Sequence, residues 1–433
     1  MTDNLESAVA AARAAFPAWS QTSMAERLDL LGRLQGLIAD AADDLATLIS
    51  TEVGTPIRVS RMLQVEGPRL TLANYREVLP QIALEEKVGS SVVVRQPLGV
   101  VACITAWNYP LQQAVGKVGG ALATGCTAVL KPSELAPQSA FRLAELIEKA
   151  GFPTGVFNLV TGGPEVGAAL VEHRDVDMIH FTGSTATGRR IAASAAASVK
   201  RLSLELGGKS ANVILDDADI EQAVKVGLAN CFTNSGQTCT AWSRMLVPRR
   251  ELARVEELIA ERAARYRLGD PLDPATTMGP LVSQQQQAKV RDYIRRALAD
   301  GARLVCGGPD QPAEAPTGHF VAPTVFSDVS VDMALAQKEI FGPVLAVMPY
   351  DTEDEAVEIA NSTIFGLAGG VWSGDVQRAD RVARRIRAGQ IDINGSFFNP
   401  LAPFGGHKQS GVGRELGVYG LLEFYELTSF QYA

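Results

Sequence analysis

Residues 125–163 read GCTAVLKPSELAPQSAFRLAELIEKAGFPTGVFNLVTGG and contain a complete strand, helix and strand. The apolar run at 127–130 predicts a strand, the apolar spacing of three and four residues over 136–151 predicts a helix, and 155–163 predicts the next strand. The same order continues with a helix at 164–173, a strand at 176–184 and a helix at 186–197. Alternation of this kind is typical of a parallel, doubly wound sheet.

A second cycle of the same pattern follows residues 201–215. We expect helices near 217–235 and at 251–266, and strands at 244–248, 302–306 and 343–350. Earlier in the chain, residues 5–50 predict helices, and residues 89–110 predict two strands interrupted at Pro97. The chain is therefore expected to be an α/β protein of two units, with a boundary near Gly207 and Gly208.

The bulk composition restricts the classes of function. A chain of 433 residues exceeds what one hydrophobic core usually fills, and its net charge of -8 would repel nucleic acid and anionic membranes. We therefore expect neither partner. The first residues, MTDNLESAVAAARAAF, lack a basic region followed by an apolar one, and no uncharged run approaches a span of about 20 apolar residues. A cytoplasmic location is expected.

The cysteines and histidines indicate neither a disulfide framework nor a metal site. The four histidines are isolated, and the cysteines are odd in number and lack CxxC spacing. Thiol chemistry is the remaining possibility. The cysteines are Cys103, Cys126, Cys231, Cys239 and Cys306.

Two stretches could hold a dinucleotide. FTGSTATG at 181–188 places a Gly-Ser-Thr turn before a helix, where N–H groups face an anion, although an ordinary N-cap turn is the alternative. Lys131 and Glu134 follow a predicted parallel strand, where ligands bind in open α/β sheets. A donor and an acceptor suit a ribose diol, and the carboxylate would repel a 2′-phosphate, which favours NAD over NADP. A surface lysine beside a helix start is the alternative.

Three further residues are candidates for catalysis. Glu205 stands in an otherwise apolar strand and is either a buried general base or an edge-strand carboxylate facing water. Cys239 follows NSGQT at a turn where N–H groups could stabilise a thiolate and an oxyanion, yet free cysteines are often only buried structural residues. Asn108, at the end of a buried strand, is either a turn former or an oxyanion donor.

Together, and in this order, these motifs resemble the aldehyde dehydrogenase superfamily across essentially the whole chain. Six motifs agree, and they are followed by Asn394 and PFGGHKQSG at 403–411. The six are ITAWNYP at 104–110, KPSE at 131–134, FTGST at 181–185, ELGGK at 205–209, GQTC at 236–239 and EIFGP at 339–343.

The resemblance implies oxidation of an aldehyde to a carboxylic acid with NAD, by the hydrolytic route. Cys239 takes the position of the nucleophile that forms a thiohemiacetal, Asn108 that of the oxyanion donor, and Glu205 that of the residue that activates water against the thioester. Lys117 and Glu415 match positions thought to assist proton transfer. A cofactor-independent cysteine acyl hydrolase and a non-catalytic member of the fold are the alternatives.

The resemblance also implies a Rossmann-like NAD-binding domain at 1–80 and 98–207, an α/β catalytic domain at 208–409 and a β oligomerisation element at 81–97 and 425–433. The chain ends and the 80–94 region are shorter than is usual in the family, so we expect a homodimer, with a homotetramer as the alternative. The implied cofactor contacts are Ile104, Thr105, Trp107, Lys131, Ser133, Glu134, Gly163, Phe181, Thr182, Gly183, Ser184, Leu206, Gly207, Glu339 and Phe341.

Substrate preference is indicated by only a few positions. Tyr109 occurs in members that accept cationic aldehydes, but those members have a tryptophan where this chain has Gly116, which disfavours a quaternary ammonium substrate. Phe397, Phe398 and Leu401 suggest an apolar mouth, suited to aliphatic or aromatic aldehydes.

Overall fold

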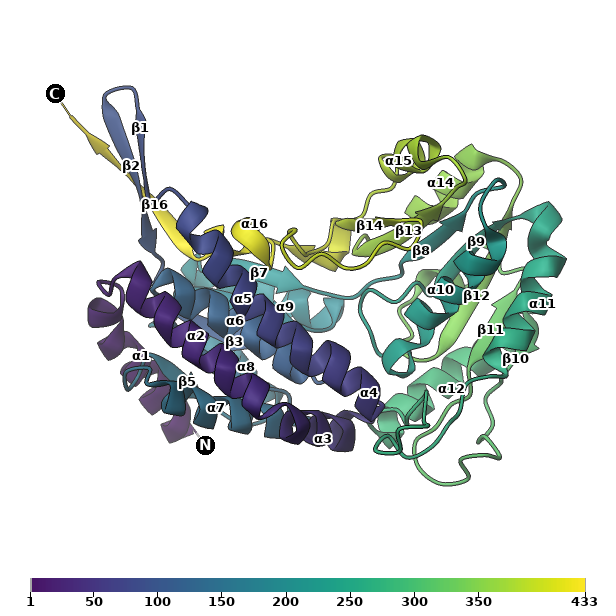
Figure 1. The fold of residues 1–433 in the computed structure, drawn as a ribbon, viewed down its shortest axis with the longest axis horizontal. Coiled ribbons are helices and arrows are strands. Elements are labelled where there is room, and N and C mark those ends of the chain that lie inside the picture. The colour runs from purple at the N-terminus through teal and green to yellow at the C-terminus, as the bar shows by residue number, and fades with distance from the viewer. Residues whose placement is uncertain (1, 433) are drawn as a thin grey trace.

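The computed structural model describes residues 2–432, which form two α/β units and a projecting β arm (Figure 1). The chain starts with a helical segment that packs on the first unit. Ser23 accepts a hydrogen bond from the Glu26 N–H and so caps the second helix, and Gly54 ends the third with a φ of 85°. The helices are α1 (Thr2–Trp19), α2 (Met24–Asp40), α3 (Ala42–Val53), α4 (Ile57–Val59), the π-helical turn η1 (Ser60–Val65) and α5 (Glu66–Val78).

A six-stranded sheet forms the centre of the first unit, in the order β15-β7-β6-β3-β4-β5. Every neighbouring pair is parallel except β15 with β7. The strands are β3 (Val100–Ile104), β4 (Thr127–Lys131), β5 (Phe157–Leu159), β6 (Met178–Thr182), β7 (Arg201–Glu205) and β15 (Gly411–Val412), and the connecting helices are α6 (Pro110–Thr124), α7 (Gln138–Ala150), α8 (Pro164–Glu172) and α9 (Thr185–Ala195). The expected α/β class with a parallel sheet is confirmed. Because β3 lies between β4 and β6, the strand order reverses there, and a ligand crevice is expected at the carboxyl ends of these strands.

The second unit contains a seven-stranded sheet in the order β10-β11-β12-β9-β8-β13-β14, in which only β10 is antiparallel to its neighbour. The helix expected near 217–235 is shorter, because Asp219 caps it and it ends at Phe232. The strands are β8 (Ala211–Ile214), β9 (Arg244–Pro248), β10 (Arg303–Cys306), β11 (Thr324–Ser327), β12 (Val344–Tyr350), β13 (Ala368–Trp372) and β14 (Gln390–Ile393). The helices are α10 (Ile220–Phe232), α11 (Leu252–Ala263), α12 (Gln284–Ala299), α13 (Ala334–Gln337), α14 (Glu353–Asn361) and α15 (Val376–Ala383).

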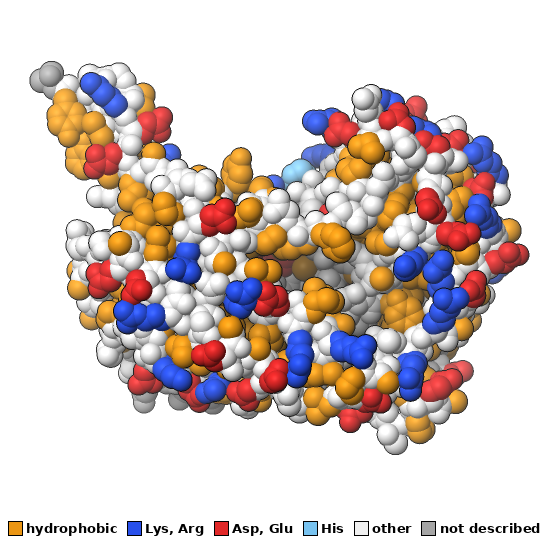
Figure 2. Space-filling view, viewed as in Figure 1, with side chains coloured by type: hydrophobic (Ala, Val, Ile, Leu, Met, Phe, Trp, Pro, Cys, Tyr) orange, Lys and Arg blue, Asp and Glu red, His pale blue; other side chains and the backbone are white. Residues whose placement is uncertain are grey.

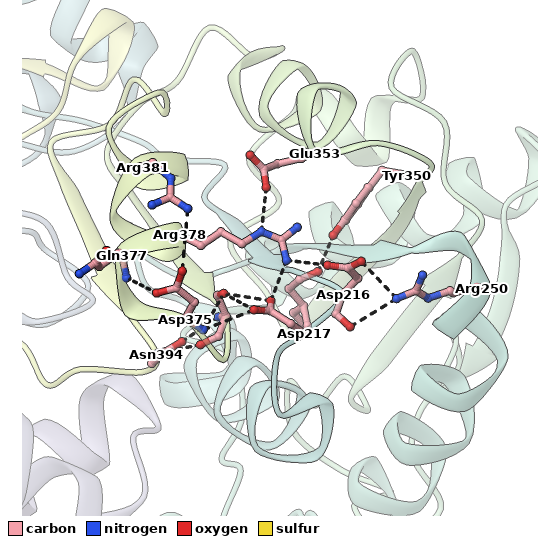
Figure 3. A network of polar contacts seen from close by, with 12 residues as sticks. Asp216, Asp217, Arg250, Tyr350, Glu353, Asp375, Gln377, Arg378, Arg381 and Asn394 are labelled. Atoms are coloured by element: carbon pink, nitrogen blue, oxygen red, sulfur yellow. Dashed lines mark hydrogen bonds and ion pairs between the residues drawn. The ribbon is translucent and has the colours of Figure 1, made fainter.

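A polar network closes the carboxyl edge of this second sheet (Figure 3). Arg378 lies 2.7 Å from Asp216, 3.0 Å from Asp217 and 3.0 Å from Glu353. The hydrogen bond from Arg378 lowers the pKa of Asp216. In the same network Asn394 Nδ2 donates to the Ser373 carbonyl at 3.0 Å, which fixes the end of β14. Asn394, which belongs to the motif series, is thus a structural residue of this edge.

Three antiparallel strands form the arm that projects from the body in Figure 1, in the order β1-β2-β16. They are β1 (Glu85–Val88), β2 (Ser91–Pro97) and β16 (Tyr425–Gln431). Residues 411–422, which the sequence-based division leaves unassigned, return to the first unit as β15 and α16 (Gly417–Leu422). No helix within residues 2–432 is both long enough and apolar enough to cross a membrane.

Candidate active site

The predicted site residues gather where the carboxyl edge of the six-stranded sheet meets the linker 206–210 and the loop before β9. A hollow separates the two units on the face shown in Figure 2. The sheet contributes Thr105, Lys131, Ser184 and Glu205 directly at or just after the ends of β3, β4, β6 and β7. The second unit contributes Cys239, between α10 and β9, and Glu339, between α13 and β12. Residues more than a hundred positions apart therefore meet at one edge.

The segment before Cys239 is held in an unusual backbone conformation. Asn234, Ser235 and Gly236 have φ values of 54°, 56° and 72°, so three successive residues lie in the left-handed region. A Cβ on Gly236 would collide with the Gly342 carbonyl. Two non-glycine residues in this region cost on the order of 1–3 kcal/mol each unless the surroundings hold them.

Side-chain hydrogen bonds hold this conformation. Thr55 Oγ1 donates to Asn234 Oδ1 at 2.6 Å, and Ser235 Oγ donates to the Gly279 carbonyl at 2.7 Å. Gln237 Oε1 accepts from the Val282 N–H at 2.9 Å. The strained turn is thereby tied to both units, and it leaves Cys239 half-buried rather than enclosed. Sequence reasoning did not identify Thr55, Gly279 and Val282, because each lies far along the chain from the NSGQT stretch that it supports.

Asn108 points its amide nitrogen at the Cys239 loop. Its Oδ1 accepts from Gln113 Nε2 at 2.8 Å, and this contact fixes which side of the amide carries the oxygen. Its Nδ2 donates to the Gln237 carbonyl at 3.0 Å, which leaves the second N–H of the amide for another acceptor. The Asn234 side chain in turn donates to the Asn108 carbonyl at 3.0 Å. This geometry suits an oxyanion donor.

Glu205 ends β7 and is 3% exposed, and its Oε1 has no hydrogen-bond partner within residues 2–432. Burial raises the pKa of Glu205 to about 8, and the charge of Glu415 adds to the rise, whereas hydrogen bonding with Cys239 and the charge of Lys117 oppose it. Burial, followed by the charge and hydrogen bonding of Glu205, raises the pKa of the Cys239 thiol well above its ordinary value. The thiol and the carboxyl are therefore neighbours that affect each other's protonation.

The two glycines of the linker allow close contacts on both sides. The Gly208 N–H donates to Glu339 Oε1 at 3.0 Å, and a Cβ on Gly207 would collide with the same carboxylate. A Cβ on Gly208 would collide with the Cys239 carbonyl. Beside them the Phe341 ring meets Trp107 edge-on, with 5.4 Å between the ring centroids. Only glycine lets the linker pass between the carboxylate and the cysteine loop.

A buried polar cluster adjoins Glu205 from the side of α6. Lys117 is fully buried, and its Nζ lies 2.6 Å from Glu415 Oε1 and 2.6 Å from Thr182 Oγ1. His180 Nε2 lies 2.9 Å from the same Glu415 oxygen. Although burial acts against it, the charge of Lys117 and the contact with His180 hold the pKa of Glu415 well below its usual range. His180 was missed by sequence reasoning, because an isolated histidine in an apolar strand indicates nothing beyond core packing.

The dinucleotide candidates lie along the same edge. Lys131 is 5% exposed, and its Nζ is 3.5 Å from Glu134, whose carboxylate reaches solvent. Ser184 caps α9 and accepts from the Thr187 N–H at 3.2 Å, so the positive end of an 11-residue helix faces the crevice. Thr105 Oγ1 is buried and lacks a partner in the described chain. A lysine, an accessible carboxylate, a helix N-terminus and an unpaired buried hydroxyl fit the phosphates and ribose of a dinucleotide.

Some implied contacts cannot act through their side chains. Ile104, Phe181 and Leu206 pack into the core of the first sheet. The Thr182 hydroxyl is used by Lys117, and Gly163 serves as the N-cap of α8. Gly183 lies against the Phe181 ring, and Ser133 Oγ accepts from the Leu135 N–H at 3.3 Å. Most of these positions could contact a ligand only through their backbone N–H or C=O groups.

Comparison with known proteins agrees with this geometry. A model of the aldehyde dehydrogenase family matches residues 1–430. A 3-succinoylsemialdehyde-pyridine dehydrogenase from Pseudomonas sp is 48% identical over 431 residues, which cover 98% of this chain and 90% of that protein. A solved structure of aldehyde dehydrogenase C from Pseudomonas syringae, a cysteine-to-alanine mutant in complex with NAD+ and octanal, has a TM-score of 0.98 and 46% identity, over 99% of this chain and 89% of that one. A Mycobacterium tuberculosis aldehyde dehydrogenase complexed with NAD+ has a TM-score of 0.97 and 40% identity, over 99% and 90% of the two chains.

Proposed function

This chain belongs to the aldehyde dehydrogenase family and oxidises an aldehyde to the carboxylic acid with NAD+ as hydride acceptor, and we propose that the reaction proceeds through Cys239, Glu205 and Asn108. One observation supports this assignment above the others. Glu205, from the end of β7, lies close enough to Cys239, from the loop before β9, that each group affects the pKa of the other, in addition to the larger effect of burial on both. A base and a nucleophile are thereby brought together across the boundary between the two units.

In the first half-reaction the Cys239 sulfur bonds to the aldehyde carbon. The thiol proton passes to Glu205, because a thiolate is the attacking species and Glu205 is the adjacent carboxylate. Negative charge then develops on the former carbonyl oxygen. The second N–H of the Asn108 amide and the Cys239 backbone N–H stabilise that charge, and the product of this step is a thiohemiacetal on Cys239.

The crevice on the first sheet would hold the cofactor. Lys131 and Glu134 would bind a ribose, the capped start of α9 at Ser184 would face the pyrophosphate, and Glu339 would bind the second ribose. A bound NAD+ would supply the hydride acceptor, and loss of hydride from the thiohemiacetal on Cys239 would give a thioester. The role of the protein residues in this step is to orient the two reactants, since Gly207 and Gly208 leave room for both beside Cys239.

Glu205 first releases the thiol proton to solvent and so becomes ionised again. In the second half-reaction it takes a proton from water, which attacks the thioester carbon. The carbon–sulfur bond breaks, the acid leaves, and Cys239 is regenerated. Glu205 suits this role because its pKa of about 8 makes it a base of useful strength in a site that excludes most water. Lys117 and Glu415 then assist removal of that proton from the buried site.

The substrate is proposed to be an apolar aliphatic or aromatic aldehyde. Phe397 is 98% exposed and Phe398 50% exposed, in the loop that follows β14. Exposed aromatic rings of this kind often mark a binding surface, and the hydrocarbon tail of the aldehyde would cover them. The octanal complex of the Pseudomonas syringae relative supports this choice. Residue 116 is glycine and therefore has no aromatic side chain to complete a box around a quaternary ammonium group.

We also propose that the protein forms a homodimer through the β arm. In β16 the side chains of Leu427 and Phe430 are 63% and 42% exposed, and the strand lies at the edge of its sheet. An unpaired edge strand that carries exposed apolar side chains favours pairing with another chain.

The proposal is tested by mixing the protein with NAD+ and octanal, shorter alkanals, benzaldehyde or betaine aldehyde, and following NADH absorbance. We expect turnover with the apolar aldehydes and little with betaine aldehyde. Cys239→Ala should abolish turnover, whereas Cys306→Ala, a half-buried cysteine in β10, should not. Turnover that survives Cys239→Ala would refute the assignment of the nucleophile, and aldehyde-independent ester hydrolysis without NAD+ would favour a hydrolase instead.

A further inference from the structure

A buried histidine in β6 has no part in the mechanism given above. His180 is 1% exposed, and its ring packs on Phe424 with 5.5 Å between the ring centroids. Nε2 lies 2.9 Å from Glu415 Oε1, while Nδ1 is buried without a hydrogen-bond partner in the described part of the chain. A buried nitrogen without a partner is costly, and an apolar side chain would fill the same place at no such cost. The imidazole is therefore expected to do something that an apolar residue cannot.

His180 and Lys117 donate to the same carboxylate oxygen. The two contacts end on Glu415 Oε1 at 2.9 Å and 2.6 Å, and neither uses Oε2. Burial and the charge of Lys117 lower the pKa of His180, so the imidazole is neutral near pH 7. Because an ionised carboxylate only accepts, Nε2 must carry the hydrogen and Nδ1 the lone pair.

The strand places this pair next to Glu205. His180 and Thr182 are two residues apart on β6 and share one face of the sheet. Thr182 is the register partner of Glu205 on β7, and its hydroxyl is bonded to Lys117. A row of hydrogen-bonded polar groups therefore runs from Thr182, which neighbours Glu205 across the two strands, through Lys117 to Glu415, and His180 lies at the far end of the row.

The other ionisable groups beside this row are mostly neutral. Cys103, from β3, is the register partner of His180, and burial raises the pKa of its thiol to about 12, so it is neutral. Tyr75, from α5, is buried and neutral for the same reason. The ionisable groups that face His180 and Glu415 are Tyr75, Cys103, Lys117, Glu205 and Cys239.

We propose that His180 is a positioning residue for the proton transfer that follows thioester hydrolysis. After the water attack the proton sits on Glu205, and it must leave before the next turnover. The two donors fix the Glu415 carboxylate through Oε1 and leave Oε2 as a hydrogen-bond acceptor that orients the water carrying this proton away from Glu205. The Glu415 side chain is 12% exposed, so the proton then passes to solvent. This inference rests on the proposed role of Glu415.

Four variants test the inference: His180→Leu, His180→Gln, Glu415→Gln and the double change His180→Leu with Glu415→Gln. Rapid mixing with NAD+ and excess octanal separates the first burst of NADH from the steady state. His180→Leu should lower the steady-state kcat roughly tenfold, a modest part of a general-base contribution, and leave the burst rate unchanged. Because the affected step follows hydride transfer, KM for octanal should fall with kcat, and kcat/KM should stay the same. His180→Gln, which keeps an N–H donor, should restore much of kcat. On the Glu415→Gln background, His180→Leu should have no further effect.

The outcomes separate the two proposals. If Glu415→Gln leaves kcat unchanged, the role of Glu415 is refuted, and that of His180 with it. If Glu415→Gln lowers kcat but His180→Leu does not, or if the two effects multiply, only the inference about His180 is overturned. His173→Leu is the matched control, because His173 Nε2 lies 3.2 Å from Glu6 Oε2 outside the site. Should His180→Leu fail to fold, nitrogen NMR of the wild-type histidines decides the matter, since a His180 that is not the neutral Nε2–H form at pH 7 overturns the inference.

Discussion

At the scale of single residues, Cys239 and Glu205 are both groups whose protonation state limits their reactivity. Each must lose its proton to act, yet burial raises the pKa of both groups. Near pH 7 the ligand-free protein therefore holds a neutral thiol beside a mostly neutral carboxyl. The same arrangement protects the sulfur, because a thiol reacts much more slowly than a thiolate with oxidants and other electrophiles.

The first prediction concerns the pH dependence of turnover. Glu205 accepts protons only when ionised, so kcat/KM, which reports the free enzyme, should rise with pH and level off above about 8, the pKa of this carboxyl. Steady-state rates from pH 6 to 10 measure this limb. Glu205→Gln should lower kcat by about 10²–10⁴-fold and remove the limb. A limb that persists unchanged in Glu205→Gln would assign it to another group.

The second prediction concerns stability. The pKa of Glu205 in the folded protein, about 8, exceeds its ordinary value of 4.5, so the unfolded chain loses this proton first. Folding stability therefore falls as pH rises from about 4.5 to about 8, by a few kcal/mol at most. Because glutamine does not titrate, Glu205→Gln should raise the Tm relative to wild type at pH 9 but not at pH 5.

Thermal unfolding across this pH range measures the difference between the two proteins. Glu257→Gln, at an exposed position of α11, is the control and should change Tm equally little at both pH values. If the Tm difference between Glu205→Gln and wild type does not depend on pH, folding does not raise the pKa of this carboxyl, and the prediction is wrong.

At the scale of elements, the turn before Cys239 stores strain that the surroundings hold in place. Asn234 and Ser235 adopt positive φ values only because Thr55 and the Gly279 carbonyl hold their side chains. The strain allows the chain to reverse direction within a few residues and to present Cys239 at the boundary between the units. A relaxed loop would leave the sulfur position undefined, and misplacement by about 1 Å can cost on the order of 10²-fold in rate.

The third prediction is that Gly236→Ala destroys this turn. The added methyl would collide with the Gly342 carbonyl at a residue whose φ is 72°, so both sterics and backbone conformation oppose it. We expect a loss of about 1–3 kcal/mol of stability and a larger proportional loss of kcat. Gly167→Ala in α8 is the control: its Cβ meets nothing within 4 Å, so a helical alanine should stabilise the protein by about 0.5–1 kcal/mol. Equal effects of the two changes on activity would contradict the strained-turn account.

Local sequence patterns predict most of the fold but little of the support around the site. Strand and helix periodicity is local, so the α/β class and most elements follow from the sequence. The sequence also indicates Glu205 as a candidate buried carboxylate, since the signal lies in its neighbours in the chain: an apolar strand and the two glycines that follow. Lys117 and Glu415 are 298 residues apart and meet only in the fold, and their pairing carries no local signal. The same is true of Thr55 with Asn234 and of His180 with Glu415.

At the scale of the whole molecule, the chain crosses between its two units and then returns. The linker 206–210 carries it from β7 to β8, and β15 brings it back beside β7, where Gly411 pairs with Glu205. The return delivers Glu415 to the first sheet, and the last strand, β16, continues into the arm beside β2. The site and the arm are thus joined through one short C-terminal segment.

The fourth prediction is that the arm carries the homodimer contact. Leu427 and Phe430 are apolar and exposed on β16, whose outer edge pairs with no strand within residues 2–432. Changing both to aspartate would place charges along the edge, and like charges brought together by strand pairing repel each other. Sedimentation velocity should then show a dimer for wild type and a monomer for Leu427→Asp with Phe430→Asp. Leu304→Asp, on the edge strand β10 of the other sheet and 37% exposed, should remain a dimer. A double variant that stays dimeric, or a Leu304→Asp protein that dissociates, would place the contact elsewhere on the molecule.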